Sequence, residues 1–271
     1  MKKIYNYVMI NISLTKLPII LAITYIYQFS LFFELITRNT KYNFFDVLLN
    51  NFNSISLFNI ISLFFLVMLY NIFGKNNFLK YITLKLSSKV QVYNSNIFTI
   101  FLLSIFMVFF INIVSILECL NNISFKNVWS EHFFNTMTGD LNLFYDTNII
   151  ELLTNKITPF EYISYTNILV ILYLFFLGIL FYNINIIIKK RNVSLFLIII
   201  INVISILLDS VPGIIGRLTF TQNIFFVTAN IKDFYNYSFI SWRLLYWILL
   251  ILSVYIFGIY STKKIDYNFE D

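Results

Sequence analysis

The segment GKNNFLKYITLKLSSKVQVYNSN, residues Gly74–Asn96, lies between two long apolar runs and decides how the rest of the chain is interpreted. It contains several lysines and no acidic residue. Leu79, Ile82 and Leu86 recur at spacings of three and four, together with Val90, so they share one face of a helix. We therefore predict a short helix in this segment that docks either on lipid or on a partner protein.

The composition around this segment is that of a membrane protein. Of the 271 residues, 59% are hydrophobic and only 12% are charged, with a mean hydropathy of +0.79, whereas soluble domains carry about 25% charged residues. A soluble chain of this length could not bury so much apolar surface. A transmembrane barrel would show much weaker apolar segments. We predict an all-α integral membrane protein with one membrane domain, residues 1–271.

Cysteine and histidine usage restricts the possible chemistry. The single cysteine, Cys119, excludes an internal disulfide and a cysteine-based metal cluster, and the single histidine, His132, argues against a histidine-based metal site. The net charge of +6 is explained by lysines that set membrane topology rather than by a basic domain. We expect no nucleic-acid partner.

Six apolar runs are long enough to cross about 30 Å of hydrocarbon at 1.5 Å per residue. They are Leu17–Ile36, Ile55–Phe73, Ile97–Leu117, Ser164–Ile188, Val193–Leu208 and Ser241–Tyr260. Six crossings place both termini on one side. Twelve of the nineteen Lys and Arg residues then lie on the side of the termini, which predicts that both termini are cytoplasmic. Residues 1–16 are predicted to form an interfacial helix.

The largest polar connection is the outer loop Glu118–Ile163, which is mainly acidic. Short apolar stretches at Val128–Phe134 and Ile149–Leu153 predict some packed structure within it. Two interpretations stay open. The loop is either a solvated cap or a vestibule through which a cationic or amphipathic substrate enters or leaves.

A second outer stretch, Asp209–Ile240, is too interrupted for two crossings and too apolar for an ordinary loop. Pro212, Gly213 and Gly216 break a helix, so we predict one or two short re-entrant helices covered by protein. Arg243 is a candidate outer gate residue, either with Asp209 or with Glu118. The alternative is that these charges reach headgroups or pair with one another.

Motifs of known catalytic sites are absent from the sequence. It contains no GxxxxGK[ST] phosphate-binding loop, no paired glutamates in an apolar helix, no GxSxG and no HExxH, so we predict that the chain is not an enzyme. Polar residues within the apolar runs are predicted to form hydrogen bonds between helices rather than to bind substrate: Thr24, Gln28, Ser62, Asn112, Asn183 and Asn202. Aromatic residues near the ends of the last span are predicted to form interface belts: Trp242, Tyr246, Trp247 and Tyr260.

This layout resembles the permease subunit of ABC-2-type transporters. The stretch FLKYITLKLSSKVQVYNSN (Phe78–Asn96) looks like the apolar and basic segment that leads into the third span. PGIIG (Pro212–Gly216) looks like the break before the re-entrant helices, and YSTKKIDYNF (Tyr260–Phe269) looks like the basic-then-acidic ending. The outer loop after the third span is longer than is common in the family. It leaves open a branch for export of antimicrobial peptides or self-protection against them.

The resemblance implies a membrane unit that exports an amphipathic substrate and is driven by a separate cytoplasmic ATPase, which would bind ATP and Mg. No cofactor is expected in this chain. Two permease chains would pair in the cell membrane. The residues implied to contact the ATPase are Leu79, Lys80, Ile82, Leu84, Lys85 and Leu86. The alternative is a stand-alone multi-pass immunity or scaffold protein without an ATPase.

Overall fold

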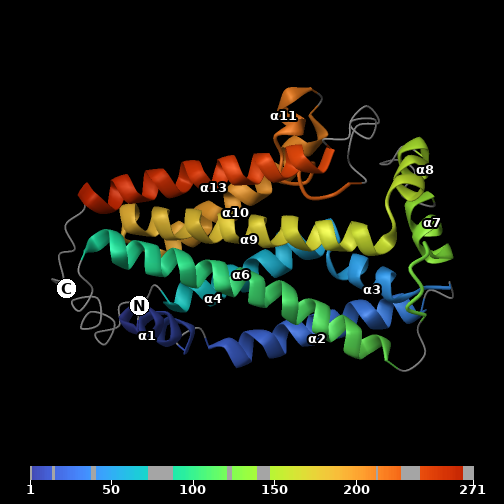
Figure 1. Ribbon diagram of the computed structural model, residues 1–271, viewed down its shortest axis with the longest axis horizontal. Helices are drawn as coiled ribbons and strands as arrows, with labels where there is room; N and C mark the ends of the chain where they lie inside the picture. Colours follow the sequence, from blue (N-terminus) through green and yellow to red (C-terminus); the bar gives the residue numbers. More distant parts are fainter. Residues whose placement is uncertain are drawn as a thin grey trace.

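The computed structural model describes residues 2–13, 16–37, 41–72, 88–120, 124–138, 147–211, 213–226 and 239–264. Long helices run side by side along the longest axis, and the N-terminal helix α1 (Lys2–Ser13) and the C-terminal end of α13 lie at one end (Figure 1). We call this the terminal end, and the opposite end, with the short helices α7 and α8, the loop end. The long helices are α2 (Leu17–Thr37), α4 (Ser62–Ile72, after the π-helical turn η1, Ser56–Ile61), α6 (Lys89–Cys119), α9 (Pro159–Ile188), α10 (Arg191–Leu207) and α13 (Phe239–Lys264).

The predicted helical membrane architecture is confirmed at this level. Four helices are long and apolar enough to cross a membrane, namely α2, α6, α9 and α13. A fifth span is obtained if α3 (Phe44–Asn51) and the helix Ser56–Ile72, which meet at a 52° bend, form one broken crossing. The remaining apolar helix, α10, is shorter. The chain is a multi-pass helical membrane protein.

Local signals in the sequence explain where several helices begin. Asn43 and Asp46 form a capping box at the start of α3, and Thr158 and Glu161 form another at the start of α9. Ser88 accepts a hydrogen bond from the backbone N–H of Gln91 and starts α6. The helix therefore begins at Lys89, eight residues before the predicted third span, because this cap satisfies a backbone donor at the helix start.

The core lies where α9 is surrounded by its neighbours. Tyr173, Leu174 and Leu177 on α9 are fully buried, and α9 packs against α4, α6, α10 and α13. In contrast, α2 and α13 leave most of their apolar surface exposed. This pattern is expected of peripheral helices that face lipid, since lipid is as apolar as the side chains it contacts.

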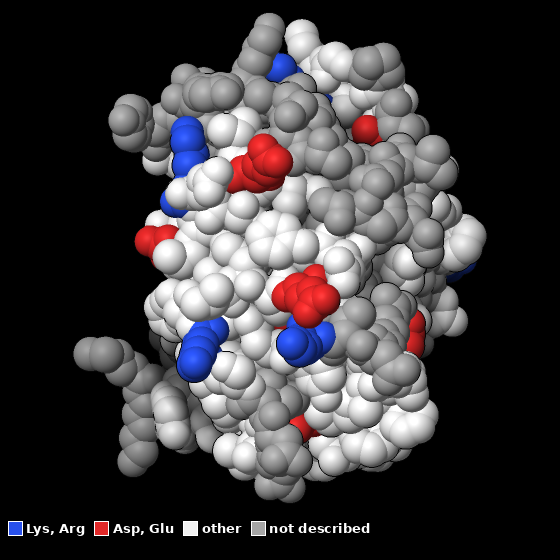
Figure 2. Space-filling model, turned by 90° about the vertical axis from the view of Figure 1, so that its right-hand side faces the viewer, with Lys and Arg blue, Asp and Glu red and all other residues white. Residues whose placement is uncertain are grey.

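The loop end is capped by packed structure. Helices α7 (Glu131–Thr138) and α8 (Thr147–Lys156) lie there, close to the two apolar stretches predicted within the outer loop. Asn43 donates to the carbonyl of Val128 at 2.7 Å, and Trp129 donates to the carbonyl of Ile157 at 3.1 Å. Side chains of both charge signs are spread over this end (Figure 2). The cap is thus joined to the starts of α3 and α9.

Candidate functional site

The first candidate region, which we call the broken segment, comprises residues 208–226 at the loop end, between α10 and α13. It begins with one 3-10 turn, Leu208–Ser210, continues through Gly213 with a positive φ of 93°, and forms the short helix α11, Ile214–Arg217. A Cβ at Gly216 would meet the carbonyl oxygen of Val211. Of the predicted residues here, Pro212 lies outside the described residues.

The backbone of the broken segment is held by side chains at the start of α13. The Nε and Nη2 atoms of Arg243 each donate to the carbonyl oxygen of Gln222 at 3.0 Å, and Nη2 also donates to Phe225 at 3.2 Å. The guanidinium lies over the ring of Phe226, 4.6 Å from its centroid. Arg243 is 5% exposed. It therefore binds carbonyl groups that a continuous helix would have satisfied internally.

The predicted gate pairs of Arg243 are not formed. Asp209 instead accepts a hydrogen bond from the Thr219 hydroxyl, at 3.0 Å from Oδ1. The carboxylate oxygens of Glu118 are buried and have no hydrogen-bond partner in the described part of the chain. The physical reason is that irregular backbone at membrane depth needs donors, and the guanidinium supplies them to Gln222 and Phe225.

Two aromatic residues of α13 continue this attachment. Trp247 donates its indole N–H to the carbonyl of Asn223 at 3.0 Å, and the hydroxyl of Tyr246 donates to Leu218 at 2.7 Å. Trp247 is fully buried, so its predicted place in an interface belt is wrong. Trp242 and Tyr260, in contrast, are 64% and 57% exposed, as a belt requires.

The second candidate region is the start of α6 at the terminal end. The side-chain oxygen of Asn96 accepts from the Tyr7 hydroxyl and from Asn11, both at 3.0 Å, and its amide donates to Tyr182 at 2.6 Å. These bonds join α1 (Lys2–Ser13) to α6 and α9. Asn96 is 5% exposed. Asn96 was predicted to lie before the third span, and its partners are distant in the sequence, so no local pattern indicated this cluster.

A further set of contacts lies one turn away on the same helix. Tyr93 stacks on Tyr182, with ring centroids 5.6 Å apart, and Asn183 donates to the carbonyl of Val254 at 2.7 Å. Gly258 of α13 lies so close to Tyr93 and Asn183 that an added Cβ would overlap both side chains. Helices α6, α9 and α13 thus approach most closely at the terminal end.

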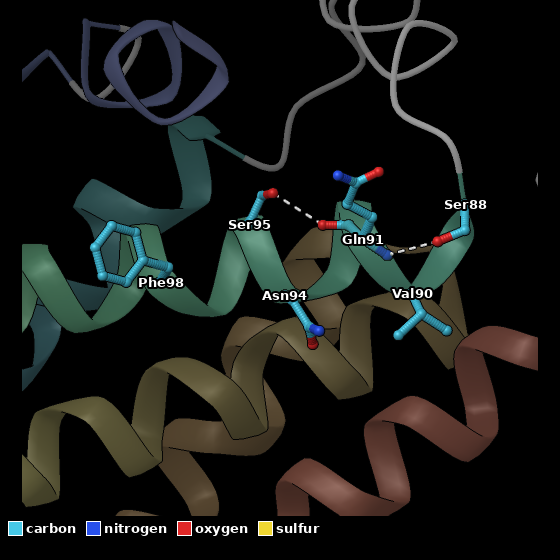
Figure 3. A pocket seen from close by; sticks show the side chains of 6 residues that line it. All are labelled: Ser88, Val90, Gln91, Asn94, Ser95 and Phe98. Carbon is cyan, nitrogen blue, oxygen red and sulfur yellow. Dashed lines mark hydrogen bonds between the residues drawn. The ribbon is translucent and has the colours of Figure 1, made fainter. Parts of the chain in front are cut away.

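The surface of α6 next to this cluster carries a pocket of about 310 Å³ (Figure 3). It is lined by Ser88, Val90, Gln91, Asn94, Ser95 and Phe98. These side chains are uncharged, so the pocket offers hydrogen bonds and apolar contact rather than acid–base chemistry. It directly follows the segment that contains the predicted ATPase contacts. Those residues lie outside the described part of the chain: Leu79, Lys80, Ile82, Leu84, Lys85 and Leu86.

Most of the polar residues predicted within the spans connect helices, whereas Thr24 donates to the carbonyl of Ile20 in its own helix. Gln28 donates to the carbonyl of Ile111 at 3.1 Å, and Asn202 donates to the carbonyl of Phe58 at 2.6 Å. The π-helical turn η1 contains Phe58, and Asn202 lies within hydrogen-bonding distance of Ser62 as well. Among the described residues, no group of three or more His, Cys, Asp or Glu side chains could hold a metal ion. The arrangement is suited to mechanical coupling between helices.

In the described part of the chain, basic residues occur at both ends of the bundle, whereas acidic residues occur at only one. The acidic residues of the described part all belong to the loop end: Glu34, Asp46, Glu118, Glu131, Glu151, Glu161 and Asp209. The terminal end carries basic residues instead, of which these have described side chains: Lys16, Lys89, Lys189, Lys190, Arg191, Lys263 and Lys264. Such a difference is typical of the two faces of a membrane protein.

No family model matches the chain, and no solved structure matches it. The chain is similar to the uncharacterized protein BH0177 of Halalkalibacterium halodurans, with 26% identity over 211 residues. That similarity covers 75% of this chain and 72% of the relative.

Proposed function

We propose that the chain is the membrane-spanning permease subunit of an ATP-driven exporter of the ABC-2 type. The single observation that carries the proposal is the order of the parts along the bundle. Helix α1, the C-terminal end of α13 and the described residues that flank segment 73–87 lie at the terminal end, whereas the broken segment lies towards the loop end between the last two long helices. This order is the one that the resemblance implies.

In this proposal all six long helices cross the membrane. Helix α10 has 17 residues, about 25 Å at 1.5 Å per residue, which is at the short limit for a span. Its 3-10 extension, Leu208–Ser210, and the protein-covered broken segment complete the crossing. The basic terminal end faces the cytoplasm, where Lys and Arg accumulate.

The chain would work by transmitting motion rather than by catalysis. A separate ATPase would bind segment 73–87, and the movement would reach α6 directly, because Ser88 starts that helix. The bonds of Asn96 would then carry it to α1 and α9. At the other end, the broken segment with Asp209, Gly213, Gly216 and Arg243 would close the outer side of a path between two permease chains for an amphipathic substrate.

The proposal is tested by co-purification in a mild detergent. A tagged chain expressed with its neighbouring reading frames is expected to retain an ATPase subunit, and the triple variant Leu79→Asp, Ile82→Asp and Leu86→Asp is expected to lose it. The control variant carries three substitutions at the loop end, at exposed Lys41, Lys126 and Lys156. This variant should retain the ATPase. If no ATPase co-purifies with the unmodified chain, and the triple variant keeps its function in cells, the stand-alone immunity or scaffold protein is the better account.

A further inference from the structure

Helix α13 carries an exposed apolar stripe along nearly its whole length. Its members recur at spacings of three and four and are 44–64% exposed: Trp242, Leu245, Leu249, Leu252, Ile256 and Tyr260. From Trp242 to Tyr260 is eighteen residues, about 27 Å along a helix, which is close to the thickness of the hydrocarbon core. The two exposed aromatic residues at its ends mark the two interfaces.

The stripe leads directly to a pair of lysines. Lys263 and Lys264 are exposed and continue the same face of α13 one turn beyond Tyr260. The Nζ atom of Lys264 lies over the Tyr260 ring, 4.3 Å from its centroid. Because Tyr260 is at the edge of the hydrocarbon, both ammonium groups are at the depth of phospholipid headgroups.

Two more lysines lie at the same level on the neighbouring helix. Helices α9 and α13 run parallel, since Tyr173 contacts Trp247 and Asn183 contacts Val254. Helix α9 ends at Ile188 and is followed directly by Lys189 and Lys190, so these lysines lie at the same end of the bundle as the last turn of α13. Both lysines are exposed, and Lys189 adopts a left-handed conformation that ends the helix.

No acidic residue of the described part lies at this end of the bundle. Residues 265–271, which contain three acidic residues, lie outside that part. The described cluster is therefore cationic, at headgroup depth, and continuous with a lipid-facing stripe. We propose that Lys189, Lys190, Lys263 and Lys264, with Tyr260, form a binding surface for the anionic headgroups of phospholipids.

The main test measures which lipids remain on the purified chain. The protein is reconstituted in vesicles of phosphatidylcholine and phosphatidylglycerol at a ratio of about three to one. It is then extracted in mild detergent, and the lipids that it retains are quantified by mass spectrometry. The variant K189Q/K263Q/K264Q is compared with the loop-end control K41Q/K126Q/K156Q, which removes the same number of exposed lysines.

The unmodified chain and the loop-end control are expected to retain phosphatidylglycerol above its share in the vesicles. The terminal-end variant is expected to lose this enrichment by fivefold or more, since one lysine near an anionic surface changes local lipid occupancy by about fivefold. The variant K189R/K263R/K264R should keep the enrichment and shows that the positive charge, not folding, is responsible. Equal enrichment in the glutamine variant, or an equal loss in the loop-end control, overturns the proposal.

A second measurement separates lipid from free phosphate and from a protein partner. Thermal unfolding in detergent is followed with short-chain phosphatidylglycerol, with phosphatidylcholine of the same chains, or with inorganic phosphate. Only phosphatidylglycerol should raise the Tm, and only when the lysines are present. An equal rise with inorganic phosphate would replace the lipid site by a phosphate site. Loss of a co-purifying ATPase with unchanged lipid enrichment would assign the lysines to protein contact.

Discussion

The broken segment at the loop end and the start of α6 at the terminal end satisfy buried polar groups with hydrogen bonds of different kinds. In the broken segment the backbone leaves the helix, and side chains of α13 bind the freed carbonyl groups, as Arg243 does for Gln222 and Phe225. At the terminal end the helices stay regular, and side chains such as Asn96 bind one another across them. Backbone groups cannot be removed by mutation, whereas side-chain partners can. The broken segment should therefore be the more sensitive region.

The largest effect is expected from Arg243→Met, which removes the hydrogen bonds that the guanidinium donates to two backbone carbonyls of the broken segment. We expect a loss of about 3 kcal/mol in the free energy of unfolding, measured by thermal unfolding in detergent. The matched control is Arg217→Met, because Arg217 belongs to the same segment but is exposed. If the two variants unfold at the same temperature, the broken segment does not depend on this attachment.

The next largest effect tests the packing at the terminal end. An alanine at Gly258 places a Cβ against the ends of the Tyr93 and Asn183 side chains, which must shift or push the helices apart. Overpacking of this kind costs about 2 kcal/mol. Ser253→Ala, on the exposed side of the same helix, provides the comparison and should leave the melting temperature unchanged. A stable Gly258→Ala variant would mean that α13 does not approach α6 as closely as described.

Asn96→Leu should be milder than Arg243→Met, although it removes three hydrogen bonds. Each bond between membrane helices is worth about 0.6 kcal/mol, so we expect a loss of about 1.8 kcal/mol for the three bonds. Combining Asn96→Leu with Tyr7→Phe should cost less than the two single changes together, because each single change already removes the bond between Tyr7 and Asn96. Additive effects in this double-mutant cycle would contradict a shared bond.

The smallest expected effect separates two tryptophans of α13. Trp247→Phe removes the bond to Asn223 from a fully buried position and should cost about 1 kcal/mol. Trp242→Phe, at a position 64% exposed, should leave the melting temperature of the detergent-solubilised protein unchanged. If the two substitutions change the melting temperature equally, Trp247 is not distinguished from Trp242 as a residue that holds the broken segment.

The sequence predicted the parts of the fold that depend on long apolar runs. The six predicted spans all correspond to helices, with the third and fourth starting several residues earlier in the structure than predicted. The additional residues at the start of each helix include polar ones, which the apolar pattern does not count. The first residue of each helix is instead set by its capping residue, Ser88 for α6 and Thr158 for α9. The short helix α3 was not predicted, because eight residues carry too little periodicity; only the spacing of Asn43 and Asp46 indicated it.

The candidate site was harder to predict because its bonds join distant residues. The interruption at Gly213 and Gly216 was visible in the sequence, and Arg243 was selected as a partner for it. The choice between a carboxylate and backbone carbonyls as the acceptor depends on three-dimensional packing, and in the described part of the chain Arg243 donates to backbone carbonyls. Asn96 and Tyr7 are 89 residues apart, so no local pattern connects them.

The claim on which the account depends is that the terminal end and the loop end lie on opposite sides of the membrane, with the terminal end in the cytoplasm. Single cysteines at Lys263 and at Lys126, introduced with Cys119→Ala, test it by labelling with a membrane-impermeant maleimide. We predict that the cysteine at 126 is labelled in intact cells and the one at 263 only after the membrane is permeabilised. Labelling of the cysteine at 263 in intact cells would contradict the account.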